Sequence, residues 1–405
     1  MKKYIFLTFS ITGLSGNPRY VNNKCRWLKQ RGWEVLVFWH NDVKKVQLEH
    51  VLPFSGKEYI IHELGYYPSW FTKCKRKGVV NKIVEQVGLA DQIVIESNTL
   101  PLGAWGELLA EKLKAKHINF VTTEKTQIQE KNTFDFCYAK LKRNEFFTIS
   151  EAAVNQIFSK FISLTNPEDY YWDAMMGVEV EEIPFPVFDN MPHADYVITH
   201  FGRTKGYFQY MIGEIKQFVS KHPDKKFNLF FLGQVNNPAT IEKEMEFPNV
   251  NIVFHPEVSI VPIQIFSKSD VVIGAAGCAW LSSNNGGKTI SMDVNNNQPL
   301  GLLQYTTLDS NTWSGKYENK KSLSEWLQTL LIDKTVFERM NLSNELHDYD
   351  YQMQFVTKPD GNYIDSTKMI EEKTSHDKIW IAMSRIGLFK FVDWLFYAKR
   401  KDKRD

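Results

Sequence analysis

Two stretches in the C-terminal half of this 405-residue chain have the residue types of an anion-binding site. In residues 270–301, an apolar segment leads into a turn of small residues at 274–277, and a second apolar segment ends at Asp293. In residues 196–207, an apolar segment ends in the turn Gly-Arg-Thr-Lys-Gly. Small residues let a backbone approach a ligand closely, helix N-termini favour anions, and paired cations bind diphosphates. Together, the two stretches predict a site for a nucleotide diphosphate.

Each candidate nucleotide contact in these stretches also has a structural interpretation. Arg203 and Lys205 follow a predicted strand, and ligands of α/β proteins bind at the carboxyl ends of strands, so we favour diphosphate binding over an exposed turn. Asp293 either accepts hydrogen bonds from sugar or ribose hydroxyls or forms a turn. Four small residues either shape the nucleotide pocket or pack a tight turn: Gly277, Ser282, Ser283 and Gly287.

A second glycine-containing loop follows the first apolar segment of the chain. Gly13 and Gly16 lie in it, together with Ser15 and Asn17. The backbone N–H groups of such a loop can face phosphates, and an ordinary connection is the alternative. Arg19 comes just inside the helix that follows, where it either reaches the phosphates or is exposed.

Three residues of the N-terminal half are candidates for a general base, which takes the proton of an acceptor hydroxyl. Glu96, Glu124 and His40 each follow a predicted strand. We favour Glu124 because its neighbours at 122, 123, 125 and 126 are polar. A structural or surface role is the alternative for each of the three. No Asp-x-Asp pair ends a strand, so we expect no metal site and no cofactor beyond the nucleotide substrate.

The composition limits the class of protein. A chain of 405 residues, 43% hydrophobic and 24% charged, predicts a globular protein of two domains. A net charge of +2 argues against a nucleic-acid partner. Four scattered cysteines without metal-ligand spacing suit a reducing cytoplasm. We interpret the apolar N-terminus as a buried strand rather than a signal peptide, and no stretch is long and apolar enough to span a bilayer.

Strand and helix patterns alternate along both halves, which predicts parallel sheets. The N-terminal half is expected to have strands at 4–11, 33–39, 92–96, 117–122 and 146–149, and helices at 19–31, 102–115 and from Ser150 on. The C-terminal half is expected to have strands at 196–200, 227–232, 250–254, 271–274 and 289–292, and helices at 206–221, 238–246, 260–268 and 279–284. Residues 183–193 contain three prolines and are the expected linker. The predicted domains are 1–185 and 186–378, followed by a helix and tail at 379–405.

The order of these motifs resembles that of the GT-B-fold glycosyltransferases over most of the chain. Three segments carry the resemblance: the Gly-rich loop, helix and strand at 12–38, the strand and helix FFTISEAAVNQIFS, and the strand and turn ITHFGRTKG. The resemblance implies an α/β GT-B fold, in which two Rossmann-like domains face each other across a cleft. It also implies that the C-terminal domain binds a sugar nucleotide and that the N-terminal domain binds an acceptor.

One departure from the family concerns its glutamates. Many retaining members carry two glutamates seven residues apart near the nucleotide sugar, whereas the matching segment CAWLSSNNGGKTISMD has none. This departure places the chain in another branch, for which inverting chemistry is one alternative. The stereochemical outcome and the nucleotide therefore stay open.

The resemblance implies a cytoplasmic glycosyltransferase. It would move a sugar from a nucleotide diphosphate to a lipid-linked or saccharide acceptor in surface polysaccharide assembly. A sugar-nucleotide 2-epimerase and a non-catalytic nucleotide-sugar-binding subunit are the alternatives. Two segments that mix aromatic rings with cations, 65–78 and 380–404, fit peripheral contact with the anionic inner face of a membrane. For the second segment, a helix that crosses back onto the N-terminal domain is the alternative.

Overall fold

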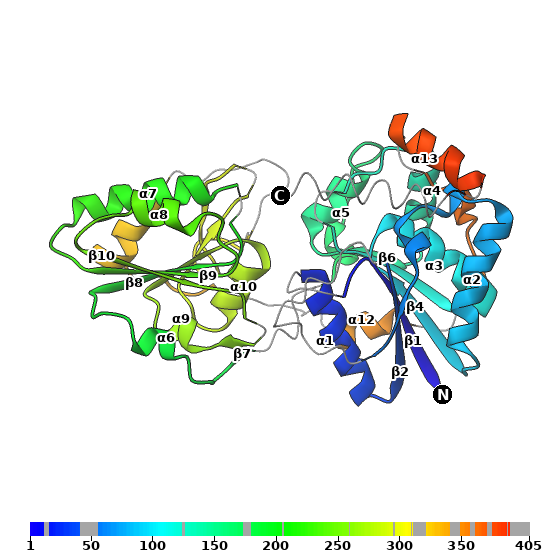
Figure 1. The fold of residues 1–405 in the computed structure, drawn as a ribbon, viewed down its shortest axis with the longest axis horizontal. Coiled ribbons are helices and arrows are strands. Elements are labelled where there is room, and N and C mark those ends of the chain that lie inside the picture. Colours follow the sequence, from blue (N-terminus) through cyan, green and yellow to red (C-terminus); the bar gives the residue numbers. More distant parts are fainter. Residues whose placement is uncertain are drawn as a thin grey trace. The chain divides into compact units, whose positions relative to one another are not determined.

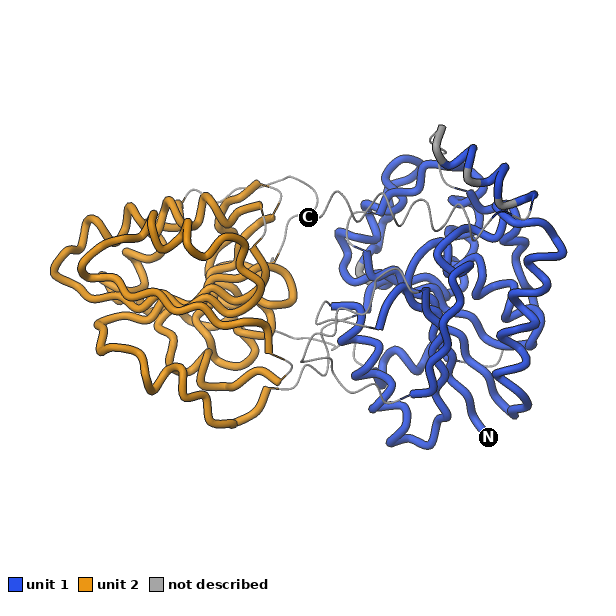
Figure 2. The backbone as a smooth tube through the Cα atoms, in the orientation of Figure 1, with its two compact units in different colours: residues 1–48, 53–176, 346–405 blue, residues 49–52, 177–345 orange. Residues whose placement is uncertain are grey.

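The chain folds into two compact units (Figure 2). The computed structural model describes residues 1–11, 16–40, 56–123, 126–172, 180–204, 206–258, 260–294, 296–308, 310, 321–340, 349–356, 361–370, 375–386 and 388. Of these, the residues up to Trp172 and those from Tyr349 on form the first unit, and Val180 to Met340 form the second.

The first unit is a six-stranded parallel sheet with helices on both faces (Figure 1). Its strands are β1 (Lys2–Thr8), β2 (Trp33–Trp39), β3 (Lys57–Ile60), β4 (Gln92–Ser97), β5 (Lys116–Val121) and β6 (Phe146–Thr148). Its main helices are α1 (Gly16–Gln30), α2 (Lys73–Val87), α3 (Leu100–Leu113), α4 (Lys131–Leu141) and α5 (Glu151–Phe158). Residues of α1 share a core with Tyr4 and Phe6, whereas residues of α2 and α3 share another with Ile5 and Leu7. Strand β1 is therefore apolar on both sides, as expected for a central parallel strand.

The second unit repeats this plan with one antiparallel edge strand. Its sheet contains β8 (Tyr196–Phe201), β9 (Phe227–Leu232), β10 (Val250–His255), β12 (Val271–Gly274), β13 (Thr289–Met292) and β14 (Pro299–Leu302). Strand β14 pairs antiparallel with β13, and a separate pair joins β7 (Val180–Glu181) to β11 (Val261–Pro262). The helices are α6 (Pro186–Asp189), α7 (Phe208–Lys221), α8 (Pro238–Glu244), α9 (Gln264–Ser267), α10 (Ala276–Asn284) and α11 (Leu323–Leu327).

Both sheets have the strand order of a Rossmann fold. The orders are β3-β2-β1-β4-β5-β6 and β10-β9-β8-β12-β13-β14, so in each unit the first strand lies between the second and the fourth. The connections from the first and the fourth strand leave in opposite directions, and ligands of such folds bind outside the carboxyl ends of these two strands. The prediction of an α/β chain with two Rossmann-like domains is confirmed.

The end of the chain belongs to the first unit. Tyr349, in α12 (Tyr349–Gln354), packs with the core on the α1 side, and Tyr363 packs on the α2 side. Ile381, in α13 (Ser375–Arg385), also packs there. The sequence placed the domain boundaries at 185 and 378, whereas in the structure the chain has already returned to the first unit at Tyr349.

Several elements differ from the sequence-based expectation. The expected linker at 183–193 contains α6, and its Phe185 and Phe188 are buried in a core of the second unit. The expected helix at 260–268 is the short strand β11 followed by α9. Strand β3 and helix α2 were not predicted. Ser150 does cap α5, because its side chain accepts a hydrogen bond from the Ala153 N–H.

The segment at 65–78 is not the loop expected to contact a membrane. It forms a 3₁₀ turn at Pro68–Trp70 and then enters α2, whose N-terminus is capped by Thr72. The side chains of Tyr67 and Phe71 are buried in the core, so they are not available to an interface. No helix among the described residues is both long and apolar enough to cross a membrane. The basic residues at 399–404 lie outside the described residues.

Candidate functional site

The two stretches that predicted a nucleotide site follow neighbouring strands. The turn with Arg203 follows β8, and the small-residue turn at 274–277 follows β12, which pairs with β8. These are the first and fourth strands of the sheet, so both turns lie at the crevice where Rossmann-like units bind ligands. The order of the strands was not predicted, and in the structure the pairing of β8 with β12 brings the two stretches together.

Glycines at this edge let neighbouring backbones pass closely. Gly202 and Gly233, which follow β8 and β9, have φ angles of +132° and +129°, a region that favours glycine. A Cβ atom on Gly233 would lie only 2.2 Å from the Gly202 carbonyl oxygen. The Gly202 N–H donates to the Leu232 carbonyl at 2.9 Å and the Thr204 N–H donates to the Gln234 carbonyl at 3.0 Å, which fixes the turn on either side of Arg203.

Arg203 is exposed at this edge and has no ion-pair partner among the described residues. Helix α10 begins beside it, with Ala275 at the N-cap and Gly277 in its first turn. Because alanine has no side-chain oxygen, Ala275 cannot cap the helix N-terminus. The Ala276 N–H donates to the Ser310 carbonyl at 2.7 Å, and the following N–H groups of the first turn carry the partial positive charge that favours an anion. The edge therefore combines a cation with this helix N-terminus. Lys205 lies outside the described residues.

The other four candidates of the second unit have structural partners. Ser282 is fully buried, accepts a hydrogen bond from Thr289 at 2.7 Å, and packs so closely on Gly287 that a Cβ there would clash at 2.3 Å. The Ser283 hydroxyl donates to the Leu303 carbonyl at 3.1 Å. Asp293 is fully buried and accepts a hydrogen bond from the Asn296 side chain at 2.7 Å. Donor contact by these residues stays a prediction, and their geometry favours the packing interpretation.

Of the glycine-containing candidate loop in the first unit, the structure describes only the part from Gly16 on. Gly13 and Ser15 lie outside the described residues, and Gly16 and Arg19 belong to the first turn of α1. A Cβ on Gly16 would meet nothing within 4 Å, so packing does not require glycine there. Arg19 is half-buried.

The three candidate bases have very different surroundings. Glu124 lies outside the described residues. Glu96 is fully buried and accepts hydrogen bonds from Lys24 and Tyr4, both at 2.6 Å, so an acceptor cannot reach it. His40 is 4% exposed, and its Nδ1 lies 2.6 Å from the His62 carbonyl oxygen. A carbonyl only accepts, so Nδ1 carries the proton and Nε2 of the neutral ring is the basic nitrogen.

The first unit also contains a buried cluster of polar side chains that was not predicted. The Ser97 Oγ lies 2.8 Å from His117 Nε2, and His117 Nδ1 lies 2.8 Å from a Glu107 carboxylate oxygen. This is the order of groups in a serine triad, but all three side chains are at most 2% exposed, so no substrate reaches the hydroxyl. Lys140 donates to Glu107 at 2.8 Å and to the His117 carbonyl at 3.0 Å. The cluster therefore joins β4, α3, β5 and α4 as part of the fold.

This cluster should make the protein sensitive to acid. Burial and the nearby Lys140 charge lower the pKa of His117 to about 4, although Glu107 opposes the shift. Burial raises the pKa of Glu107, but the Lys140 charge and the His117 hydrogen bond lower it more, so it lies below its usual range. Below pH 6.5 the unfolded chain therefore binds a proton at His117 that the folded protein does not, and below about pH 4.5 the same holds for Glu107.

We expect the free energy of unfolding to fall as the pH is lowered from 7 to 4, by up to about 3 kcal/mol from His117 alone. Urea unfolding of the full chain at a series of pH values measures this slope. His117→Gln should flatten the slope between pH 6.5 and 4, whereas His193→Gln, at an exposed position, should leave it unchanged. An equal slope in His117→Gln and the unmodified protein would show that His117 is not kept neutral by the fold.

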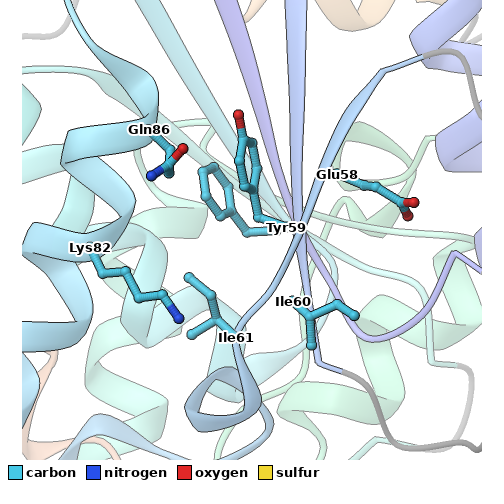
Figure 3. Close-up of a pocket in the computed structure, with 7 residues that line it drawn as sticks. Glu58, Tyr59, Ile60, Ile61, Lys82 and Gln86 are labelled. Atoms are coloured by element: carbon cyan, nitrogen blue, oxygen red, sulfur yellow. The ribbon is translucent and has the colours of Figure 1, made fainter.

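A hollow of ≈ 350 Å³ lies between the edge strand β3 and helix α2 (Figure 3). Tyr59 and Ile60 line it from the strand, Ile61 lines it from the residue after the strand, and Lys82 and Gln86 line it from the second half of α2. A crossover helix runs antiparallel to its strands, so its second half lies away from the carboxyl edge of the sheet. Lys82 and Gln86 therefore place part of the hollow on the flank of the first unit. Its other end reaches the carboxyl end of β3, where the Ile61 N–H donates to the Trp39 carbonyl at 2.9 Å, one residue before the candidate His40.

Comparisons with known proteins agree with the fold. No protein-family model matches the chain, and no curated protein matches it either. A glycosyltransferase structure from Rickettsia africae superposes with a TM-score of 0.51 at 12% identity, over 72% of this chain and 80% of that one. A putative UDP-N-acetylglucosamine 2-epimerase from Listeria monocytogenes gives 0.43 at 13% identity, over 90% and 93%. Acinetobacter baumannii MurG gives 0.41 at 12% identity, over 72% and 78%. The Rickettsia structure, whose TM-score is above 0.5, confirms the resemblance in fold.

Proposed function

We propose that the protein is a glycosyltransferase that binds a nucleotide diphosphate sugar at the carboxyl edge of the second unit. It transfers the sugar to a lipid-linked or saccharide acceptor bound by the first unit, as in surface polysaccharide assembly. The observation that carries the proposal is the position of Arg203 and the start of α10 after β8 and β12, the two strands that flank the ligand crevice of a Rossmann-like sheet.

The chemistry follows from the charge that develops on the leaving nucleotide. Arg203, with Lys205 two residues on, offsets the charge of the diphosphate as the bond to the sugar breaks. The N–H groups of the first turn of α10 that follow Ala276 favour the same anion. Glu124 takes the proton of the acceptor hydroxyl. The proposal includes no metal ion, and it leaves the sugar, the nucleotide and the linkage open.

Arg203→Ala is expected to weaken donor binding roughly ten- to hundredfold, because it removes a charge-assisted hydrogen bond to the diphosphate. Isothermal titration with UDP, GDP and their sugar conjugates measures the effect. The protein should stay folded, because the side chain is exposed.

Lys221→Ala is the matched control for this experiment. Lys221 is an exposed cation of the same unit, but it lies at the carboxyl end of α7, at the opposite edge of the sheet. The control should bind the donor like the unmodified protein. Equal donor affinity in Arg203→Ala and Lys221→Ala would show that Arg203 does not bind the donor.

A further inference from the structure

The peptide that leads into Arg203 lies directly against Gly233, at the end of β9. A Cβ atom on Gly233 would be 2.2 Å from the Gly202 carbonyl oxygen and 2.7 Å from its carbonyl carbon. Cβ atoms essentially never come within 3.0 Å of such an atom, and both of these atoms belong to the backbone. Any residue larger than glycine at position 233 therefore has to displace the peptide between Gly202 and Arg203.

The other side of β8 has a second close approach. A Cβ atom on Gly274, the last residue of β12, would lie 3.3 Å from the Phe201 carbonyl oxygen and 3.4 Å from the Ala279 nitrogen of α10. A Cβ atom on Gly202 would lie 3.4 Å from the Cys278 Sγ, in the first turn of α10. Residues 201 and 202 thus run between β9 on one side and β12 with the start of α10 on the other.

Hydrogen bonds decide which of the two glycine backbones moves more easily. The Gly233 N–H donates to the His255 carbonyl of β10 at 3.0 Å, and Gly233 is buried between its neighbours. Gly202 is half-buried and begins an exposed turn. The displacement that a Cβ atom at position 233 causes is therefore expected at Gly202 and Arg203 rather than in β9.

We propose that Gly233 and Gly274 are positioning residues, which hold the peptide before Arg203 so that Arg203 and the first turn of α10 face the same anion. This inference rests on the proposed function and names the residues that shape its donor site. A cation and a helix N-terminus act together on a diphosphate only when their spacing matches it, so the position of this peptide sets the donor affinity.

The test is a titration of the folded protein with UDP and with GDP. Gly233→Ala is expected to lower the affinity roughly ten- to hundredfold, because it displaces the peptide before Arg203 by about 1 Å. Gly286→Ala is the matched control. Gly286 is a glycine of the same unit with a φ angle of +87°, but a Cβ atom there would meet nothing within 4 Å. The control strains the backbone without a clash, so it should keep the affinity of the unmodified protein.

A double variant separates positioning from a purely structural role. If Gly233 acts through Arg203, Gly233→Ala should add little to the loss of affinity in Arg203→Ala, because residues that act through one contact are not additive. A structural role alone would lower the free energy of unfolding and leave the affinity of the folded protein unchanged. Urea unfolding of each variant therefore accompanies the titrations.

Equal affinity in Gly233→Ala and Gly286→Ala, or additive losses in the double variant, would overturn the positioning role. If Gly233→Ala does not fold, Gly274→Ala tests the same spacing from the β12 side, where a shift of a few tenths of an ångström relieves the contact. A severalfold loss of affinity is expected there, and an unchanged affinity would overturn the role. If the unmodified protein binds neither UDP nor GDP nor their sugar conjugates, the proposed function fails instead, so the two failures can be distinguished.

Discussion

Replacing Glu124 by glutamine is expected to lower kcat by roughly 10²–10⁴-fold, the usual contribution of a general base, while donor affinity is retained. Glutamine keeps the shape of the side chain but cannot take the proton of the acceptor hydroxyl. Donor affinity should not change, because the donor contacts of the proposed site are on the second unit. Steady-state kinetics with the acceptor present, together with a donor titration, separate the two effects.

Glu130→Gln is the matched control for this substitution. It makes the same change of charge six residues along the chain, at the start of α4. Its turnover should match that of the unmodified protein. Near-normal turnover in Glu124→Gln would move the base role to His40, whose Nδ1 is held by the His62 carbonyl and whose Nε2 is basic. Glu96 could not act as the base instead, because its buried carboxylate accepts hydrogen bonds from Lys24 and Tyr4.

Lys24→Met is expected to lower the free energy of unfolding of the first unit by about 3–5 kcal/mol, because it leaves the buried carboxylate of Glu96 without its counter-charge. Burial lowers the pKa of Lys24, and the attraction of Glu96 opposes this shift. The paired charges thus stabilise each other inside the fold. Urea unfolding of the full chain, followed by hydrogen exchange at β1 and β4, measures the loss in the unit that contains the pair.

Two further variants complete this stability experiment. Glu96→Gln in the Lys24→Met background should restore most of the lost stability, because no unpaired charge is then buried. Lys29→Met, at an exposed position of the same helix, should change stability by no more than about 0.5 kcal/mol. A Lys24→Met protein as stable as the Lys29→Met protein would show that Glu96 does not carry a buried charge.

Features with a local signal could be predicted from the sequence. Strand β1 is apolar on both faces, the Ser150 cap is set by the three residues that follow it, and the turn with Arg203 has its own composition. These signals come from neighbouring residues, so a single sequence is enough to find them. The pairing of β8 with β12, which brings the two candidate stretches together, then required only the usual strand order of the fold.

Features that depend on distant contacts could not be predicted. Lys24 and Gln352 are 328 residues apart, and no local pattern indicates that α12 packs on the first unit. Glu96 looked like a base because it ends a strand, but its partners Lys24 and Tyr4 come from α1 and β1. Helix α2 was missed because its amphipathic pattern is weak and its first turn is rich in cations. In the sequence, the polar residues at the end of β4 were the one indication of the buried hydrogen bonds around Lys24 and His117.

The most direct test of the proposed function is to incubate the full-length protein with each common sugar nucleotide and follow both the nucleotide and the sugar by chromatography, with and without a membrane extract. A transferase is predicted to release nucleoside diphosphate slowly from one donor and faster when the extract supplies an acceptor. Interconversion of two sugar nucleotides without nucleotide release would instead show an epimerase. Binding of the donor without any turnover would show a non-catalytic subunit, and either result would contradict the assignment.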